Sequence, residues 1–314
     1  MMYLAAVGGF ALLFGGGEFL VRGAVAVSRR FGLSPLLIGM TVVAWCTSAP
    51  ELVVSLGAAL RGSSDIAVGN VVGSNIFNVL GVLGASAVIA PIIVKPEALR
   101  RDTGVMLAAA LALALIALTG EIGRVAGAVL LVALAAFVTY SYRTELSGTQ
   151  PSRELHEHEA EEFTGPGSIG AGIGYLALGL GALVIGSQLL ITGATDIART
   201  YGVSEAIIGL SLVAVGTSLP ELATSVMAAA RGHADVAVGN VVGSNIFNIL
   251  GILGIAALVR PIGVAAHMAS LDVWVMLGVC VTLALLLLVR GRIGRIEGGV
   301  FLALYAGYMV LLFS

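Results

Sequence analysis

The decapeptide GNVVGSNIFN occupies residues 69–78 and recurs, letter for letter, at residues 239–248. The offset of 170 residues aligns much more than this decapeptide, because residues 31–90 match residues 201–260 at 34 of 60 positions. Within that alignment SAPEL at 48–52 meets SLPEL at 218–222. The chain is therefore an internal duplication, and the nature of the duplicated unit decides the fold.

The composition indicates a membrane protein. Of the 314 residues, 58% are hydrophobic and 11% are charged, and the mean hydropathy is +1.04, whereas a soluble domain is about 25% charged. A hydrophobic run of roughly 18–25 residues can cross a bilayer as a helix, which satisfies its backbone groups internally. We expect ten such runs, at about 3–27, 33–60, 65–90, 103–119, 124–142, 168–194, 203–230, 235–259, 271–289 and 296–313.

Each half of the duplication contains five of these runs. Because five is odd, the second half must enter the membrane from the opposite side to the first. We predict an all-α membrane protein of ten transmembrane helices in two inverted five-helix repeats, residues 1–142 and 168–314, joined by a polar linker at 143–167. This architecture is typical of secondary transporters that bind their substrate near the membrane midplane.

The basic residues predict an orientation in the cell (plasma or inner) membrane. When alternate loops are assigned to opposite sides, twelve of the sixteen Lys and Arg residues fall on one side. The positive-inside rule then places the 143–167 linker in the cytoplasm and both termini outside. The only lysine, Lys95, follows Val94, so the chain has no phosphate-binding Gly-Lys-Ser/Thr loop. We expect no ATP, nucleic-acid or cofactor site, and the sequence does not identify a protein partner.

The second run of each half carries a proline and a glutamate near its centre, in AWCTSAPE (44–51) and AVGTSLPE (214–221). Pro50 and Pro220 lack an N–H and loosen the backbone four residues earlier. The spacing predicts one helical stripe of oxygen donors around each glutamate, which suit Ca²⁺ and Na⁺. An ionisable group inside a membrane indicates function. The two stripes are Ala44, Thr47, Ser48 and Glu51, and Ala214, Thr217, Ser218 and Glu221.

The repeated decapeptide follows in the third run of each half. Ser74 and Asn78 are one helical turn apart, as are Ser244 and Asn248. Glycines four residues apart allow close approach of two helices, and we interpret each decapeptide as a close-packing helix that presents oxygens to the glutamate helix. The remaining asparagines are interpreted as neutral supports between helices. The glycines include Gly73 and Gly243, and the supports are Asn70, Asn75, Asn240 and Asn245.

We interpret three sets of charged residues outside this cluster as structural and not as parts of a site. Asp65 and Asp235 follow short polar loops, where a helix N-cap is expected. Glu18 and Arg22 are spaced for an i,i+4 ion pair. The acid- and His-rich part of the 143–167 segment is interpreted as a solvated linker and not as a metal site.

The GTSLPE-like and GNVVGSNIFN-like motif pairs resemble those of the cation/Ca²⁺ exchanger superfamily, and of prokaryotic Na⁺/Ca²⁺ exchangers in particular, over essentially the entire chain. We therefore expect Ca²⁺ and Na⁺ as transported ions. The resemblance implies that the glutamates hold Ca²⁺, that hydroxyls and alanine carbonyls complete Na⁺ sites, and that the first and sixth helices slide across the rest. The implied ion cluster is Ala44, Thr47, Ser48, Glu51, Ser74 and Asn78, with Ala214, Thr217, Ser218, Glu221, Ser244 and Asn248.

Two positions depart from the family pattern. Asn248 stands where Na⁺/Ca²⁺ exchangers commonly have aspartate, and Cys46 stands where the second half has Gly216. The missing aspartate argues against a K⁺-dependent exchanger. Glu51 and Glu221 still supply a charge of −2, which one Ca²⁺ or two Na⁺ would neutralise.

Three other functions compete with Na⁺/Ca²⁺ exchange. A H⁺/Ca²⁺ antiporter of the same fold would protonate the glutamates, but the stripe of hydroxyls and carbonyls offers coordination that a proton does not require. A membrane-embedded enzyme would use the glutamates as an acid/base pair, but no His, Cys or Lys partner is in register. A passive channel would show no counter-ion dependence.

Overall fold

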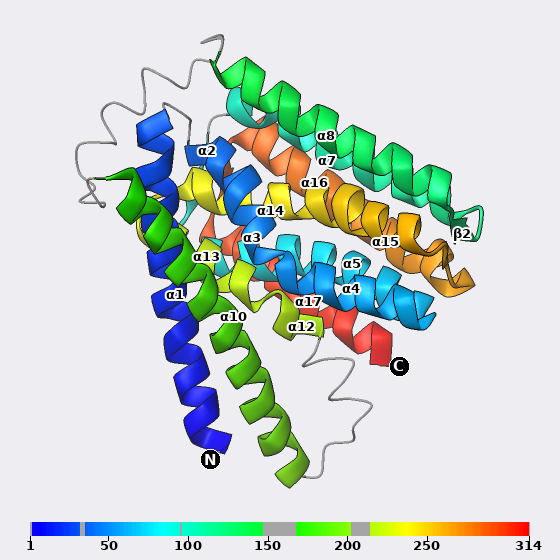
Figure 1. The fold of residues 1–314 in the computed structure, drawn as a ribbon, viewed down its shortest axis with the longest axis horizontal. Helices are drawn as coiled ribbons and strands as arrows, with labels where there is room; N and C mark the ends of the chain where they lie inside the picture. Colours follow the sequence, from blue (N-terminus) through cyan, green and yellow to red (C-terminus); the bar gives the residue numbers. More distant parts are fainter. Residues whose placement is uncertain (1, 32–34, 95, 147–167, 202–213, 314) are drawn as a thin grey trace.

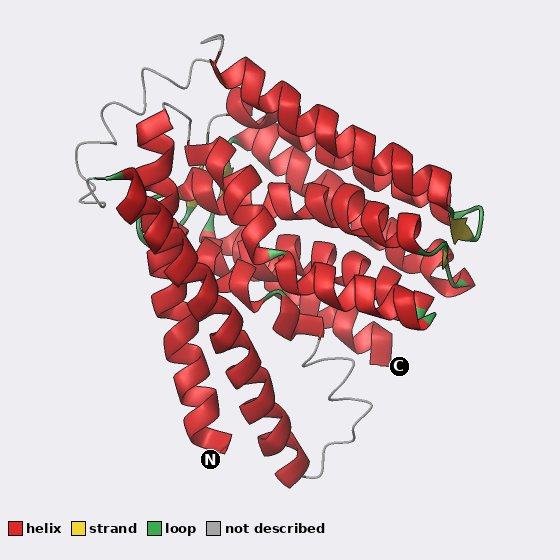
Figure 2. Cartoon of the chain, viewed as in Figure 1, coloured by secondary structure: helices red, strands yellow, loops and turns green. Residues whose placement is uncertain are grey.

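The computed structural model describes residues 2–31, 35–94, 96–146, 168–201 and 214–313. These residues form helices, several of them continued by π-helical turns, together with four two-residue strands (Figure 2). The helices of the first half are α1 (Met2–Phe31), α2 (Pro35–Ile38), η1 (Gly39–Val43), α3 (Ala44–Thr47), α4 (Ala49–Arg61), α5 (Ser64–Phe77), η2 (Asn78–Leu83), α6 (Gly84–Ile89), α7 (Pro96–Ala117) and α8 (Arg124–Leu146). Those of the second half are α10 (Ile169–Thr200), α12 (Ala214–Thr217), α13 (Leu219–Ala230), α14 (Ala234–Ile246), η4 (Phe247–Leu253), α15 (Gly254–Val259), η5 (Met268–Asp272), α16 (Val273–Leu285), η6 (Leu286–Arg290) and α17 (Arg295–Phe313).

The predicted helical membrane class is confirmed. Within the described residues, seven helices are long and apolar enough to cross a membrane, or up to eight if the bent pair at the second expected run is one span. The fourth expected run, 103–119, overlaps α7, which ends at Ala117 and carries Arg100, Arg101 and Asp102 in its first two turns. The seventh expected run begins at 203, and its first eleven residues lie outside the described part.

Helices α1 and α10 form a long antiparallel pair beside the other helices (Figure 1). Their contact is built on glycines that recur every seven residues, so that they share one helix face. A Cβ added at Gly16 would lie 2.9 Å from the carbonyl oxygen of Gly179, and one added at Gly179 would lie 2.5 Å from the backbone nitrogen of Leu20. Small residues at these positions allow the two backbones to touch. The glycines are Gly9, Gly16 and Gly23 in α1, and Gly172, Gly179, Gly186 and Gly193 in α10.

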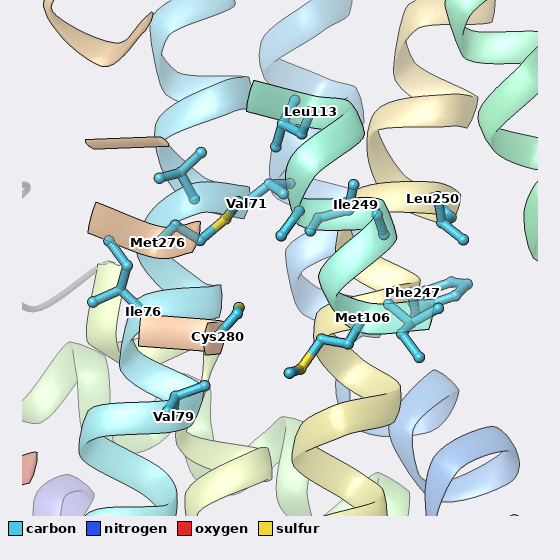
Figure 3. Packing of buried hydrophobic residues seen from close by; sticks show 14 of the residues in the cluster. Val71, Ile76, Val79, Met106, Leu113, Phe247, Ile249, Leu250, Met276 and Cys280 are labelled. Atoms are coloured by element: carbon cyan, nitrogen blue, oxygen red, sulfur yellow. The ribbon is translucent and has the colours of Figure 1, made fainter. Parts of the chain in front are cut away.

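The helices of the repeated decapeptide form the centre of the molecule. The spans that contain α5 and α14 are 78% and 89% buried by protein, whereas those of α8 and α17 are 22% and 11% buried. Apolar side chains of α5, α7, η4 and α16 belong to one buried cluster there, among them Val71, Leu113, Ile249 and Met276, which Figure 3 labels. Polar residues on the inner faces of α5 and α14 are therefore withdrawn from lipid as well as from water.

Short strands join the two halves at the loop ends. β1 (Ile92–Ile93) pairs antiparallel with β4 (Arg292–Ile293), and β2 (Glu121–Ile122) pairs antiparallel with β3 (Ile262–Gly263). The 170-residue offset maps β1 onto β3 and, within one residue, β2 onto β4. Each pair is therefore the counterpart of the other, with the roles of the halves exchanged.

The structure differs from two predictions at helix ends. The N-cap prediction for the aspartates is wrong, because Ser63 and His233 occupy the cap positions while Asp65 and Asp235 lie one residue inside the helix. A carboxylate in the first turn still interacts favourably with the positive end of the helix dipole. The predicted linker starts at 143, but α8 continues to Leu146, and residues 147–167 lie outside the described part.

Candidate cation site

The helix that carries each glutamate begins where a preceding short helix is interrupted. α3 ends at Thr47 and α4 starts at Ala49, with a bend of 53° between Gly39–Thr47 and Ala49–Arg61. Pro50 lies in the first turn of α4, where its missing N–H removes no helical hydrogen bond. The predicted stripe is therefore bent at Ser48, although backbone hydrogen bonds from Ser48 to Ala44 and from Leu52 to Ser48 continue through the bend. Its members remain neighbours because the break is only one residue long.

The second half has the same break. α12 ends at Thr217, α13 starts at Leu219, and Pro220 lies in its first turn. Glu51 and Glu221 each occupy the first turn of their helix and are fully buried. The positive end of a helix dipole stabilises a negative charge at this position. The breaks thus provide both carboxylates with a favourable field inside the protein.

The serines at the breaks bond across the halves. Ser-x-x-Glu is the pattern of a local capping box, but neither Ser48 nor Ser218 makes a side-chain bond to its own helix. Ser48 Oγ donates to Glu221 Oε1 at 3.0 Å, and Ser218 Oγ donates to Glu51 Oε1 at 2.8 Å. Ser218 Oγ also lies 3.1 Å from Ser74 Oγ. The two halves therefore meet at the carboxylates.

The threonines bond across the halves as well. Thr47 Oγ1 donates to Asn240 Oδ1 at 3.2 Å and lies 3.3 Å from the Ala44 carbonyl oxygen. In the second half, Thr217 Oγ1 is the counterpart of Thr47 Oγ1 and lies 3.5 Å from Asn70 Oδ1. Each threonine hydroxyl therefore lies within hydrogen-bonding reach of an asparagine of the opposite half.

The asparagines that accept from the threonines are held by serines one helix away. Asn70 Nδ2 donates to Ser55 Oγ at 2.9 Å and lies 3.2 Å from the Glu51 carbonyl oxygen. Asn240 Nδ2 donates to Ser225 Oγ at 3.0 Å. Sequence reasoning missed both serines, although the signal was present, since Ser55 and Ser225 obey the 170-residue offset.

The two amides of the predicted set are each held through their nitrogen. Asn78 Nδ2 donates to Asn245 Oδ1 at 3.1 Å, and Asn248 Nδ2 donates to Asn75 Oδ1 at 3.0 Å. The predicted supports are thus in direct contact with the predicted site residues. Asn78 begins the π-helical turn η2, and Asn248 is the second residue of η4, a local geometry that occurs frequently at functional sites.

Several buried oxygens of this cluster lack a hydrogen-bond partner among the described residues. Buried polar atoms are normally paired, and each unpaired one needs an explanation. A cation surrounded by these atoms would satisfy them all, because each oxygen can act as an acceptor. The atoms are Glu51 Oε2, Glu221 Oε2, Asn78 Oδ1, Asn248 Oδ1 and Ser244 Oγ.

The remaining predicted residues are two glycines and two alanines, and their packing differs between the halves. Gly243 packs so tightly against the Met40 backbone that an added Cβ would overlap it, as close packing requires. At Gly73 no described atom lies within 4 Å of an added Cβ, and the counterpart of Met40, Leu210, is outside the described residues. Ala44 is buried, and Ala214 is the first residue of α12.

A sodium/calcium exchanger family model matches residues 1–143 and 171–314. The sodium/calcium exchanger MaX1 of Methanosarcina acetivorans is 32% identical to the chain over 97% of its length and 96% of that protein. The inner membrane protein YrbG of Escherichia coli is 36% identical over 97% of the chain and 93% of that protein.

A solved structure of the sodium/calcium exchanger NCX_Mj superposes on the chain with a TM-score of 0.84 at 32% identity. It covers 98% of this chain and 97% of its own. The family model, the relatives and the solved structure each match nearly the whole chain. The chain belongs to the sodium/calcium exchanger protein family and is a multi-pass membrane cation/Ca²⁺ antiporter.

Proposed function

We propose that the protein exchanges Na⁺ for Ca²⁺ by alternating access, with one intramembrane cation site built by both halves. The observation that carries the proposal is a set of five unpaired buried oxygens, two of them on Glu51 and Glu221, whose other carboxylate oxygens accept hydrogen bonds from the opposite half. The proposed ligands are Glu51, Glu221, Thr47, Ser48, Thr217, Ser218, Ser74, Ser244, Asn78 and Asn248, with the carbonyls of Ala44 and Ala214.

The charge of this site accounts for coupling. The hydrogen-bonding partners described above are neutral, so two carboxylates define the net charge. One Ca²⁺ or two Na⁺ would neutralise them. An unneutralised buried pair of charges is costly to move through an apolar barrier. The site therefore changes its access from one side of the membrane to the other only with one set of cations bound. Transport is then an exchange and not a leak.

Neutral oxygens favour Na⁺ over H⁺ as the counter-ion. The serine hydroxyls contact the glutamates and the threonine hydroxyls contact asparagines, and this set of neutral oxygens beside two carboxylates suits Na⁺ as a ligand set. A proton needs only a carboxylate oxygen. H⁺/Ca²⁺ exchange is the second candidate, because the same unpaired atoms, Glu51 Oε2 and Glu221 Oε2, could each take up a proton.

We propose that the two halves are inverted five-helix repeats, residues 1–142 and 168–314, giving ten spans with the 143–167 linker in the cytoplasm and both termini outside. The antiparallel contact of α1 with α10 and the exchanged pairing of β1·β4 and β3·β2 support this arrangement. The first places the equivalent helices α1 and α10 in opposite directions, and the second gives each strand pair a counterpart with the roles of the halves exchanged.

Flux measurements test the function. Purified protein in proteoliposomes is expected to take up ⁴⁵Ca²⁺ when Na⁺ is loaded inside and absent outside, at equal pH on both sides. Uptake driven by a pH gradient in the complete absence of Na⁺, and unchanged when Na⁺ is added, would establish H⁺/Ca²⁺ exchange instead. Ca²⁺ flux that depends on neither counter-ion would identify a channel.

A further inference from the structure

Asn75 and Asn245 lie fully buried at the contact between the two decapeptide helices. Each directs its side-chain nitrogen at the backbone carbonyl of the other: Asn75 Nδ2 lies 3.5 Å from the Asn245 oxygen, and Asn245 Nδ2 lies 3.4 Å from the Asn75 oxygen. The two contacts are counterparts under the 170-residue offset. They form a reciprocal pair between the halves, next to the site but outside the set of unpaired oxygens.

This contact determines which way each amide points. A carboxamide has an acceptor oxygen on one side and a donor nitrogen on the other. A backbone carbonyl can only accept, so the Asn245 carbonyl requires Nδ2 of Asn75 to face it. Oδ1 of Asn75 then faces the opposite way, toward Asn248 Nδ2 at 3.0 Å.

The orientation of the Asn75 amide determines the orientation of the Asn248 amide in the site. Because Asn75 Oδ1 needs a donor, Asn248 turns its nitrogen toward it, and the Asn248 oxygen is left without a protein partner among the described residues. The mirror path runs from the Asn75 carbonyl through Asn245 to Asn78. Rotating Asn75 by half a turn would set oxygen against the Asn245 carbonyl, even if Asn248 rotated with it.

We propose that Asn75 and Asn245 are positioning residues that set the polarity of the cation site: each fixes one site amide, Asn248 or Asn78, with its oxygen toward the cation. This inference rests on the proposed function of that site. It also gives position 248 a chemical requirement, because the residue there must donate a hydrogen bond to Asn75. An amide meets that requirement while adding no charge to the two glutamates.

Helix packing is the competing role for buried asparagines, and the two roles predict different couplings. A packing residue affects stability whatever stands at 248. A positioning residue acts on the cation only through its own partner. Residues in one hydrogen-bond network are non-additive in double-mutant cycles, whereas independent residues add.

The test is therefore a pair of cycles on the purified full-length protein. The apparent Ca²⁺ affinity is read from the Ca²⁺-dependent rise in melting temperature, with no Na⁺ or pH gradient present. Asn75→Ala is expected to weaken Ca²⁺ binding about tenfold, the size of one lost buried hydrogen bond. In the Asn248→Ala background the same change is expected to have less than about a twofold effect. In the Asn78→Ala background, the matched control, the effect is expected to stay about tenfold.

The mirror cycle uses Asn245→Ala, which is expected to couple to Asn78→Ala and not to Asn248→Ala. It provides an independent result if the Asn75 variant does not fold. Equal effects of Asn75→Ala in both backgrounds, or a loss of stability with unchanged Ca²⁺ affinity, would overturn the positioning role. A wild-type protein that binds Ca²⁺ but shows no Na⁺-dependent flux would contradict the proposed function alone and leave this inference standing.

Discussion

The cation site and the α1–α10 pair both follow the 170-residue offset, but to different extents. In the site, the serine–glutamate, threonine–asparagine and amide–amide contacts of one half each have a counterpart in the other. In the α1–α10 pair the glycines correspond, but the charges do not. Glu18 binds Arg22 at 2.6 Å and also Arg231 at 2.7 Å, which confirms the predicted ion pair and extends it to a second arginine.

The counterparts of Glu18 and Arg22 are Gln188 and Thr192, which carry no charge. The difference has a physical reason. In the proposed alternating-access exchange an ion must be released to both sides of the membrane, so equivalent contacts are needed from both halves. The ends of helices face two different solutions, and a contact that ties α1 to the end of α13 on one side needs no equivalent on the other.

The strongest test of equivalence replaces the carboxylates. Glu51→Gln and Glu221→Gln are each expected to abolish ⁴⁵Ca²⁺ uptake into proteoliposomes while leaving a folded, extractable protein, because a charge of −1 cannot neutralise Ca²⁺. The two losses should be equal if the halves share one ion. Near wild-type uptake by either variant would remove that glutamate from the site.

The exchanged serines test the contact between the halves. Ser48→Ala and Ser218→Ala each remove a hydrogen bond to a charged group, which contributes about 1.5–3 kcal/mol, so Ca²⁺ transport is expected to fall roughly ten- to a hundredfold. We expect Ser218→Ala to be more severe, because its hydroxyl also contacts Ser74. Initial rates at several Ca²⁺ concentrations measure both, and a larger defect in Ser48→Ala would contradict the assigned geometry.

Asn248→Asp tests the departure from the family pattern. An ionised carboxylate at 248 would face Asn75 Oδ1 with an oxygen, whereas a protonated one would donate to it as the native amide does. We expect the variant to transport Ca²⁺ at low pH and to lose transport relative to wild type as the pH rises from about 6 to 9, because the new group then ionises beside two glutamates. Much tighter Ca²⁺ binding with an unchanged pH profile would mean that position 248 contacts the ion with a full charge.

The glycine contact is expected to have a smaller effect. Gly179→Ala puts a methyl group against the Leu20 backbone, and overpacking of this kind costs about 1–3 kcal/mol. Gly181→Ala is the matched control, since no described atom lies within 4 Å of its added Cβ. Thermal melting in detergent measures both. Equal melting temperatures for the two variants would contradict a tight α1–α10 contact.

The ion pair outside the symmetric region is expected to have the smallest effect. Glu18→Gln removes the contact with Arg22 and Arg231, which are 35% and 46% exposed. Ion pairs that are this exposed to solvent contribute about 0–1 kcal/mol to the free energy of unfolding. The melting temperature of the variant should therefore fall by a few degrees at most. Loss of Ca²⁺ transport without a change in melting temperature would show that the contact has a functional role.

The sequence alone determined the class of the protein, its duplication and which polar residues lie inside the apolar runs. Apolar runs of bilayer length have one stable backbone solution, and polar residues repeated inside them are too costly to lack a role. Glu51, Ser48, Asn78 and their counterparts could be named on those grounds.

Only the tertiary structure decided which partner each donor takes. Ser48 matches a local capping box in sequence, yet it bonds to Glu221, 173 residues away. The break at Ser48, the tight approach at Gly243 and the amide polarity set by Asn75 are equally invisible to local periodicity. A helix face can be predicted from spacing, but a hydrogen bond across the halves depends on how closely and at what angle the two helices pack, and that is settled by the whole core.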